Sequence, residues 1–180
     1  MRWDQQTQGQ WKGRALVRDL VAKKTNVVRI DLIAQRPQKL RADFSASLGI
    51  YLGTLTMNER ELSFLIKNQK TLYRGSPQSE KLSQLTPFPL SPRQLMRLLF
   101  DQEPDDWKCV RDEKSFLKEC MTDSHLKISW TKRQDSRRTV TILGRQFEIQ
   151  LDLSGSDSPI PTNDSMFLLT VPAGFAIKKI

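Results

Sequence analysis

Residues 26–75 carry the pattern that decides the fold, NVVRIDLIAQRPQKLRADFSASLGIYLGTLTMNERELSFLIKNQKTLYRG. Apolar and polar side chains alternate in short runs, and turn-forming residues separate the runs. In the first run Val28 and Ile30 share one face while Arg29 lies on the other, which is the period of a half-buried strand. Runs this short and this evenly spaced predict an antiparallel meander instead of βαβ units.

The strands expected in this stretch follow one another directly, over residues 27–34, 39–46, 50–57, 61–67 and 70–74. Pro37 belongs to the first turn, because it has no N–H to donate to a strand ladder. The next turn is Ser47-Leu48-Gly49, and small or polar residues are the usual choice at such a position. The large aliphatic side chain of Leu48 is therefore unusual there.

Charge predicts the register of the first hairpin. Pairing Asp31 with Asp43 would set like charges opposite each other, whereas a shift of two residues pairs Asp31 with Arg41. Opposed charges favour the shifted register by about 0.2–1 kcal/mol for each pair. The predicted hairpin therefore pairs Asp31 with Arg41 and closes with a loop over residues 34–38.

The flanking segments are expected to extend the sheet and to cover it. Residues 10–22 favour a first strand, because Gly13 and the absence of helical spacing argue against a helix. Two short helices are expected on the apolar face, one over residues 77–85 and one that begins with Ser91 as N-cap and Pro92 after it. The period of two then returns, and further strands are expected at 107–110, 116–120, 126–130, 138–143, 146–153 and 166–171.

Length and composition predict one domain over residues 1–180, with residues 1–9 as a flexible N-terminal tail. A net charge of +9 favours anionic partners, yet the cations are spread along the chain, which favours a solvated surface and no nucleic acid. No run is long enough for a transmembrane helix. The polar N-terminus is not a signal peptide, so export would require that a leader had been removed.

No catalytic or metal-binding pattern emerges, so the sequence predicts neither an enzyme nor a cofactor. His125 is the single histidine and lies near no nucleophile motif. The carboxylates of Asp31 and Asp43 lie among arginines, which explains them as ion pairs. Cys109 and Cys120 are too few for a structural zinc site, and they could form a disulfide in an oxidising compartment or remain reduced thiols.

The apolar face of the predicted sheet is the feature left for function, because the two short helices cannot cover all of it. Such a face can be an ordinary core or a cavity for an apolar ligand. Leu48 favours the cavity. If it is exposed beside Ile50 and Leu52, it could insert into a bilayer or contact acyl chains.

Three segments resemble the LolA/LolB superfamily of periplasmic lipoprotein-localisation proteins, nearest to a divergent LolB-like outer-membrane lipoprotein receptor. WKGRA at 11–15 resembles the first-strand motif, in which Trp precedes Gly-Arg-Ala. Residues 41–55 resemble the strand–loop–strand that carries Pro-Leu-Gly in LolB, with Ser47 in place of the proline. PFPL at 87–90 resembles the Pro-x-Pro-Leu segment before the covering helix.

The resemblance implies a mostly β fold with a few short helices, in which helices lid the concave apolar face of an antiparallel half β-barrel. Such a protein is a lipid-binding chaperone in protein transport. It would receive lipoprotein acyl chains from a LolA-like periplasmic carrier and pass them to the inner leaflet of the outer membrane. It would therefore lie in the periplasm, or on the periplasmic face of the outer membrane, of a Gram-negative bacterium. The absence of a lipobox cysteine leaves open whether a segment outside this sequence carries a lipid anchor.

The resemblance also assigns residues. It implies a lipid-transfer loop of Leu48, Gly49, Ile50 and Leu52. The residues expected around the acyl cavity are Val28, Ile30, Leu32, Leu40, Phe44, Leu95, Leu99 and Trp130. WKC at 107–109, Cys120 and ISW at 128–130 resemble a cysteine-bearing branch of these proteins, and we predict a Cys109–Cys120 disulfide. The alternative function is an envelope-stress sensor or protein-interaction module on the same fold.

Overall fold

A computed structural model describes residues 3–79, 90–123, 125–156, 160 and 163–180 of the chain. The strands are β1 (Gln8–Asp19), β2 (Lys24–Gln35), β3 (Lys39–Ala46), β4 (Tyr51–Met57), β5 (Leu62–Ile66), β6 (Thr71–Gly75), β7 (Lys108–Arg111), β8 (Leu117–Met121), β9 (Lys127–Gln134), β10 (Arg137–Leu143), β11 (Phe147–Ser156) and β12 (Ala176–Lys179). The helical segments are α2 (Pro92–Leu99) and two short 3-10 turns, η1 (Trp3–Gln5) and η2 (Asp164–Phe167).

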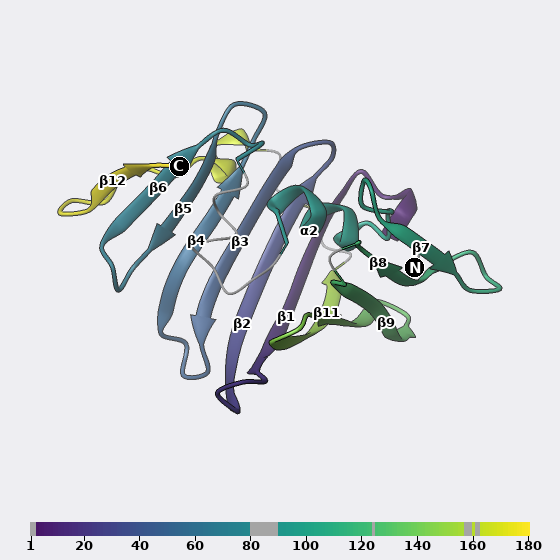
Figure 1. The fold of residues 1–180 in the computed structure, drawn as a ribbon. Helices are drawn as coiled ribbons and strands as arrows, with labels where there is room; N and C mark the ends of the chain where they lie inside the picture. The colour runs from purple at the N-terminus through teal and green to yellow at the C-terminus, as the bar shows by residue number, and fades with distance from the viewer. Residues whose placement is uncertain (1–2, 80–89, 124, 157–159, 161–162) are drawn as a thin grey trace.

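In the described residues all twelve strands form one sheet, in the order β12-β6-β5-β4-β3-β2-β1-β11-β10-β9-β8-β7 (Figure 1). Neighbouring strands are antiparallel except β12 and β6, which run parallel at one end of the sheet. The predicted mostly β, antiparallel architecture is therefore confirmed. The meander expected between residues 26 and 75 is present as β2 to β6, and the expected first strand is β1.

The register of the β2–β3 hairpin differs from the predicted one by two residues. Asp31 lies opposite Asp43 and not opposite Arg41, and the loop shortens to residues 36–38. Arg41 reaches along its own strand instead, and its Nε donates to Asp43 Oδ2 over 2.7 Å. Thr54 of β4 donates its hydroxyl to the other oxygen of Asp43. The prediction was wrong because it considered charges across one hairpin only, whereas the third strand and a same-strand arginine already satisfy this carboxylate.

The helix α2 lies over the apolar face of β1, β2 and β3 (Figure 1). Its start agrees with the prediction, since Ser91 and Gln94 form a reciprocal capping box and Pro92 is the first helical residue. Leu95, Leu98 and Leu99 of α2 are buried against the sheet. The helix is therefore held as a cover over the apolar face of β1, β2 and β3.

Trp11 and Gly13 of the WKGRA segment have separate structural roles in β1. The Trp11 ring is buried and meets Phe100, the residue after α2, edge to face with ring centroids 5.3 Å apart. A Cβ on Gly13 would lie only 2.0 Å from the backbone carbonyl oxygen of Asp152. Glycine at this position therefore allows β1 and β11 to approach closely.

The C-terminal segment differs from the prediction. Residues 166–171 form no strand. They begin in η2, where Phe167 is buried and the side chains of Arg41 and Asn58 donate to the carbonyls of Met166 and Phe167. The apolar residues of this segment alternate as in a strand, but Phe167 packs a short 3-10 turn against the rest of the protein. The strand that does form, β12, was not predicted.

Two expectations concern segments at the margins of the described structure. Most of the helix expected over residues 77–85, and most of the PFPL segment, lie outside the described residues. At the N-terminus, residues 3–9 include η1 and the start of β1. The Arg36 side chain donates to the backbone carbonyls of Asp4 and Gln6, which ties this segment to the β2–β3 loop.

Candidate functional site

An apolar cavity of about 270 Å³ lies between α2 and the sheet. Its walls are formed by Ala15, Val17, Val28, Ile30, Leu32, Phe44, Leu52, Gly53, Leu55, Phe64, Leu90, Pro92, Leu95 and Leu151. Every wall residue within the described ranges is apolar or glycine, so these residues offer no hydrogen-bonding side chain to a ligand. Such a cavity suits a hydrocarbon ligand and disfavours a polar one.

The structure brings five of the residues expected around the cavity to its wall, namely Val28, Ile30, Leu32, Phe44 and Leu95. The other three, Leu40, Leu99 and Trp130, are buried in the packed core instead. Leu40 lies at the start of β3 next to the 36–38 loop, and its side chain is fully buried in the packed core. Trp130 is on β9, three strands away from β1.

Sequence reasoning missed the contribution of the strands that flank the meander. Val17 of β1 and Leu151 of β11 line the cavity because β1 pairs with β2 on one side and with β11 on the other. Within the meander, sequence reasoning also missed Phe64 of β5, which completes the far wall and contacts Phe44 edge to face, with ring centroids 6.2 Å apart. The period of two in each strand was a usable signal, but the pairing of β1 with β11 could not be read from it.

The turn between β3 and β4 holds Leu48 away from the protein. Its side chain is 89% exposed and that of Ile50 is 58% exposed. Two backbone hydrogen bonds of 2.8 Å close the turn, from Gly49 N–H to the Ala46 carbonyl and from Ala46 N–H to the Ile50 carbonyl. Gly49 has a φ of +76°, which glycine adopts without strain. Leu52 follows the turn and lines the cavity, so the exposed loop continues directly into the cavity wall.

The polar face of the sheet carries a second, basic hollow of about 900 Å³. The cationic residues that line it are Lys12, Arg14, Arg29, Lys132, Arg137 and Arg138, with Asp152 as the one acidic residue among the described wall residues. Register places Arg14 between Arg29 on β2 and Asp152 on β11. Burial raises the pKa of Asp152, but hydrogen bonds from Thr139, Gln150 and Arg14 outweigh it and the pKa is lowered.

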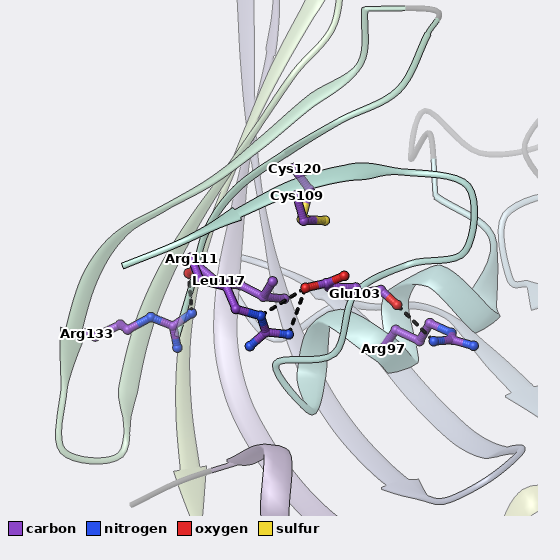
Figure 2. The surroundings of a disulfide bond; sticks show 7 residues. All are labelled: Arg97, Glu103, Cys109, Arg111, Leu117, Cys120 and Arg133. Carbon is purple, nitrogen blue, oxygen red and sulfur yellow. Dashed lines mark hydrogen bonds and ion pairs between the residues drawn. A yellow bond between two sulfur atoms is a disulfide. The ribbon is translucent and has the colours of Figure 1, made fainter. Parts of the chain in front are cut away.

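A disulfide joins Cys109 of β7 to Cys120 of β8, which are directly paired with their Cα atoms 4.1 Å apart (Figure 2). Figure 2 also shows how this hairpin is linked to α2. Arg111 forms an ion pair with the Glu103 carboxylate at 2.8 Å, and Arg97 of α2 donates to the Glu103 backbone carbonyl over 2.8 Å. Stable disulfides are typical of oxidising compartments.

A buried ion network holds the C-terminal end of α2 against β9 and β10. Asp101 Oδ2 accepts from Arg133 Nη1 over 2.7 Å and lies 3.7 Å from Arg138 Nε. Arg133 also donates to the Leu117 carbonyl, as Figure 2 shows. Burial lowers the pKa of the Arg138 guanidinium, and the charge of Asp101 opposes that effect. The network is thus a structural anchor for the cover of the cavity.

Among the described residues, no group of three or more His, Cys, Asp or Glu side chains could hold a metal ion. Over the same residues, no helix has both the length and the apolar character to cross a membrane.

Comparison with known proteins identifies the fold. No family model matches the sequence, and no curated protein matches it. The LolA superfamily protein NE2245 from Nitrosomonas europaea matches in structure with a TM-score of 0.54 at 11% identity, covering 89% of this chain and 90% of that one. The fold is LolA-like. An uncharacterized conserved protein from Thermus thermophilus matches with a TM-score of 0.48 at 9% identity, covering 95% of this chain and 90% of that one. The match with NE2245, at 11% identity, shows the fold alone and does not distinguish LolA from LolB.

Proposed function

We propose that this protein binds the acyl chains of lipoproteins in the cavity under α2 and takes part in their delivery to the outer membrane. The observation that carries the proposal is the cavity wall, in which every residue that the structure describes is apolar or glycine. The LolA-like fold supports it, because lipoprotein localisation is the function that the LolA/LolB resemblance implies. The Cys109–Cys120 disulfide supports a periplasmic location.

Burial of hydrocarbon would supply the binding energy. Each acyl methylene removed from water contributes about 0.8 kcal/mol. The cavity of about 270 Å³ lies just below the usual range of ligand pockets, ~300–1,000 Å³. It would hold part of one acyl chain as it stands. Binding of a complete lipid moiety would therefore require α2 to move away from β2 and β3.

Delivery would use the exposed turn at residues 47–50. Leu48 stands in water and its neighbour Leu52 lines the cavity, so a chain leaving the cavity would meet a side chain suited to a bilayer. The donor would be a LolA-like carrier and the acceptor the inner leaflet of the outer membrane. No cofactor takes part in this process.

Two neighbouring valines on β2 allow a matched test of acyl binding. Val28 lines the cavity, whereas Val27 points to the opposite face and lines the basic hollow. Protein purified without detergent is expected to carry an acyl ligand detectable by native mass spectrometry. Val28→Glu should lose that ligand, because a carboxylate would be buried in hydrocarbon, and Val27→Glu should retain it.

Delivery is tested separately with Leu48→Glu, which should keep the acyl ligand and lose the transfer of lipoprotein into vesicles. Equal ligand content in the Val28→Glu and Val27→Glu proteins would contradict the cavity as the binding site. A stable complex with another protein, purified free of lipid, would instead support an envelope-stress sensor or interaction module.

A further inference from the structure

We propose that one edge of the sheet is a docking surface for an anionic lipid bilayer, and that the β1–β2 turn is a second inserting tip beside the Leu48 turn. This inference deepens the proposed function, because docking on a membrane would serve the delivery of lipoproteins, and for that purpose it rests on the proposed function. Docking can be measured without any acyl cargo. The surface, called the turn edge below, consists of residues 20–24, 47–50, 67–70 and 144–146.

Strand pairing brings these four turns to the same edge. β1 and β2 pair up to Asp19 and Lys24, so their turn lies at the end of the sheet where β11 begins at Phe147. Because successive strands are antiparallel, every second turn returns to this end. The turns after β1, β3 and β5 accordingly lie along one side of the sheet in Figure 1.

The β1–β2 turn presents an apolar side chain much as the β3–β4 turn does. Val21 is 69% exposed, and Leu20 beside it is also exposed. The carboxylate of Asp19 accepts hydrogen bonds from the N–H groups of Val21 and Ala22 at 2.9 and 2.8 Å. These bonds fix the turn, so the apolar tip is ordered before it meets a membrane.

Charge separates the turn edge from the opposite edge of the sheet. The turn edge contains Lys23, Lys24, Lys67, Lys70 and Arg145, and the acidic group next to the β1–β2 turn is Asp19, which caps that turn. Within the described ranges, none of these five cations forms an ion pair. The turns at the opposite edge are mixed in charge, since they contain the acidic residues Glu59, Asp112, Glu113 and Asp135 together with Arg36, Arg60 and Lys114. Outside the turn edge as defined, but at the same end of the sheet, Asp123 between β8 and β9 is paired with Lys108.

Apolar tips among unpaired cations fit the interface of an anionic bilayer. A lysine near such a surface contributes attraction to anionic headgroups, while exposed aliphatic side chains gain from entering the acyl boundary. A single weak anchor gives only marginal attachment, and stable attachment takes at least two signals. The Val21 turn, the Leu48 turn and the cations provide these signals together.

The position of the cavity agrees with this orientation. Val17, Phe44 and Leu52 line the cavity and lie close to the turn-edge ends of β1, β3 and β4. The basic hollow also reaches this edge, at Val27 and Ser47. A bilayer docked on the turn edge would therefore face the nearer end of the cavity. The basic hollow would continue the positive charge from the turn edge along the polar face of the sheet.

The test measures binding of the full chain to vesicles of phosphatidylethanolamine with phosphatidylglycerol, and to vesicles of phosphatidylcholine alone. The intact protein should bind the anionic vesicles more tightly, and added salt should weaken that binding. Val21→Glu should reduce affinity for the anionic vesicles by about tenfold, as expected for loss of one buried valine. Leu48→Glu should have a similar effect.

The matched control is Leu168→Glu, because Leu168 is 54% exposed and follows η2 at the opposite edge. It should leave affinity unchanged. Lys23→Gln and Lys24→Gln should each lower affinity by about fivefold, while Lys114→Gln at the opposite edge should not. In a Val21→Trp protein, indole emission should shift to the blue on anionic vesicles, whereas in Leu168→Trp it should not.

The proposal is overturned if the intact protein does not bind anionic vesicles, or if Val21→Glu and Leu168→Glu bind alike. It is also overturned if the Val21→Trp emission does not shift. These failures are separate from failure of the proposed function. Vesicle binding through Val21 without any acyl ligand would leave docking intact and refute acyl carriage, and an acyl ligand without vesicle binding would do the reverse.

Discussion

Substitution of Asp101 by asparagine should destabilise the protein strongly, because Asp101 is the single carboxylate in the described structure that contacts two largely buried arginines. Its side chain is only 2% exposed, compared with 3% for Arg138 and 15% for Arg133. Asparagine keeps the shape and removes the charge. Arg133 and Arg138 would then face each other without a shared counter-ion.

Removal of one partner from a buried ion pair costs ~3–5 kcal/mol. Arg133 is the more exposed of the two arginines and can turn partly toward water, which places the expected loss near the lower value, at about 3 kcal/mol. For a chain of this length the same loss corresponds to a fall in melting temperature of about 6–12 °C. The end of α2 should loosen first, since Asp101 lies two residues after that helix.

Urea and thermal unfolding measure the loss, and Asp105→Asn is the control. Asp105 pairs with Arg97 of α2, but its side chain is 76% exposed, so its substitution should change stability by less than ~0.5 kcal/mol. A double-mutant cycle of Asp101→Asn with Arg133→Met should show coupling of about 1 kcal/mol or more. Equal stability of the two asparagine variants, or an additive cycle, would refute the network as the anchor of α2.

Two other predictions concern the disulfide and the basic hollow. Replacing Cys109 and Cys120 together by serine should lower the free energy of unfolding by about 2–3 kcal/mol, because the bridge closes a short loop of the unfolded chain; free thiols titrated in the unreduced, unfolded protein would contradict the bridge. Asp152 has a lowered pKa in the folded state, so its stabilising contribution is full above the ordinary carboxyl pKa and is lost as pH falls through the lowered value. Asp152→Asn should therefore flatten the acid limb of stability measured by urea unfolding, and an unchanged slope would count against the hydrogen bonds from Thr139, Gln150 and Arg14.

The sequence by itself determined the class of structure and the local elements. Alternation with a period of two specifies a half-buried strand whatever its partner is, and this is why β1 to β6 appear where the pattern places them. The Ser91-Pro92 start of α2 depends on a local capping box, so it too could be read from the chain. For the same reason Val28, Ile30 and Phe44 were correctly assigned to one face of the sheet.

Only the tertiary structure decided pairing and space. The β2–β3 register depends on Thr54, a residue of a third strand, and on Arg41 bonding along its own strand. Side chains on the apolar face of β3 divide into core and cavity according to what covers them, and so Leu40 is packed in the core while Phe44 lines the cavity. The alternation of apolar and polar residues predicts the face of the sheet on which a side chain lies. It does not predict which strand lies beside that side chain or which element covers it. Pairing of β1 with β11, which are distant in sequence, is what brings Leu151 to the cavity beside Val17.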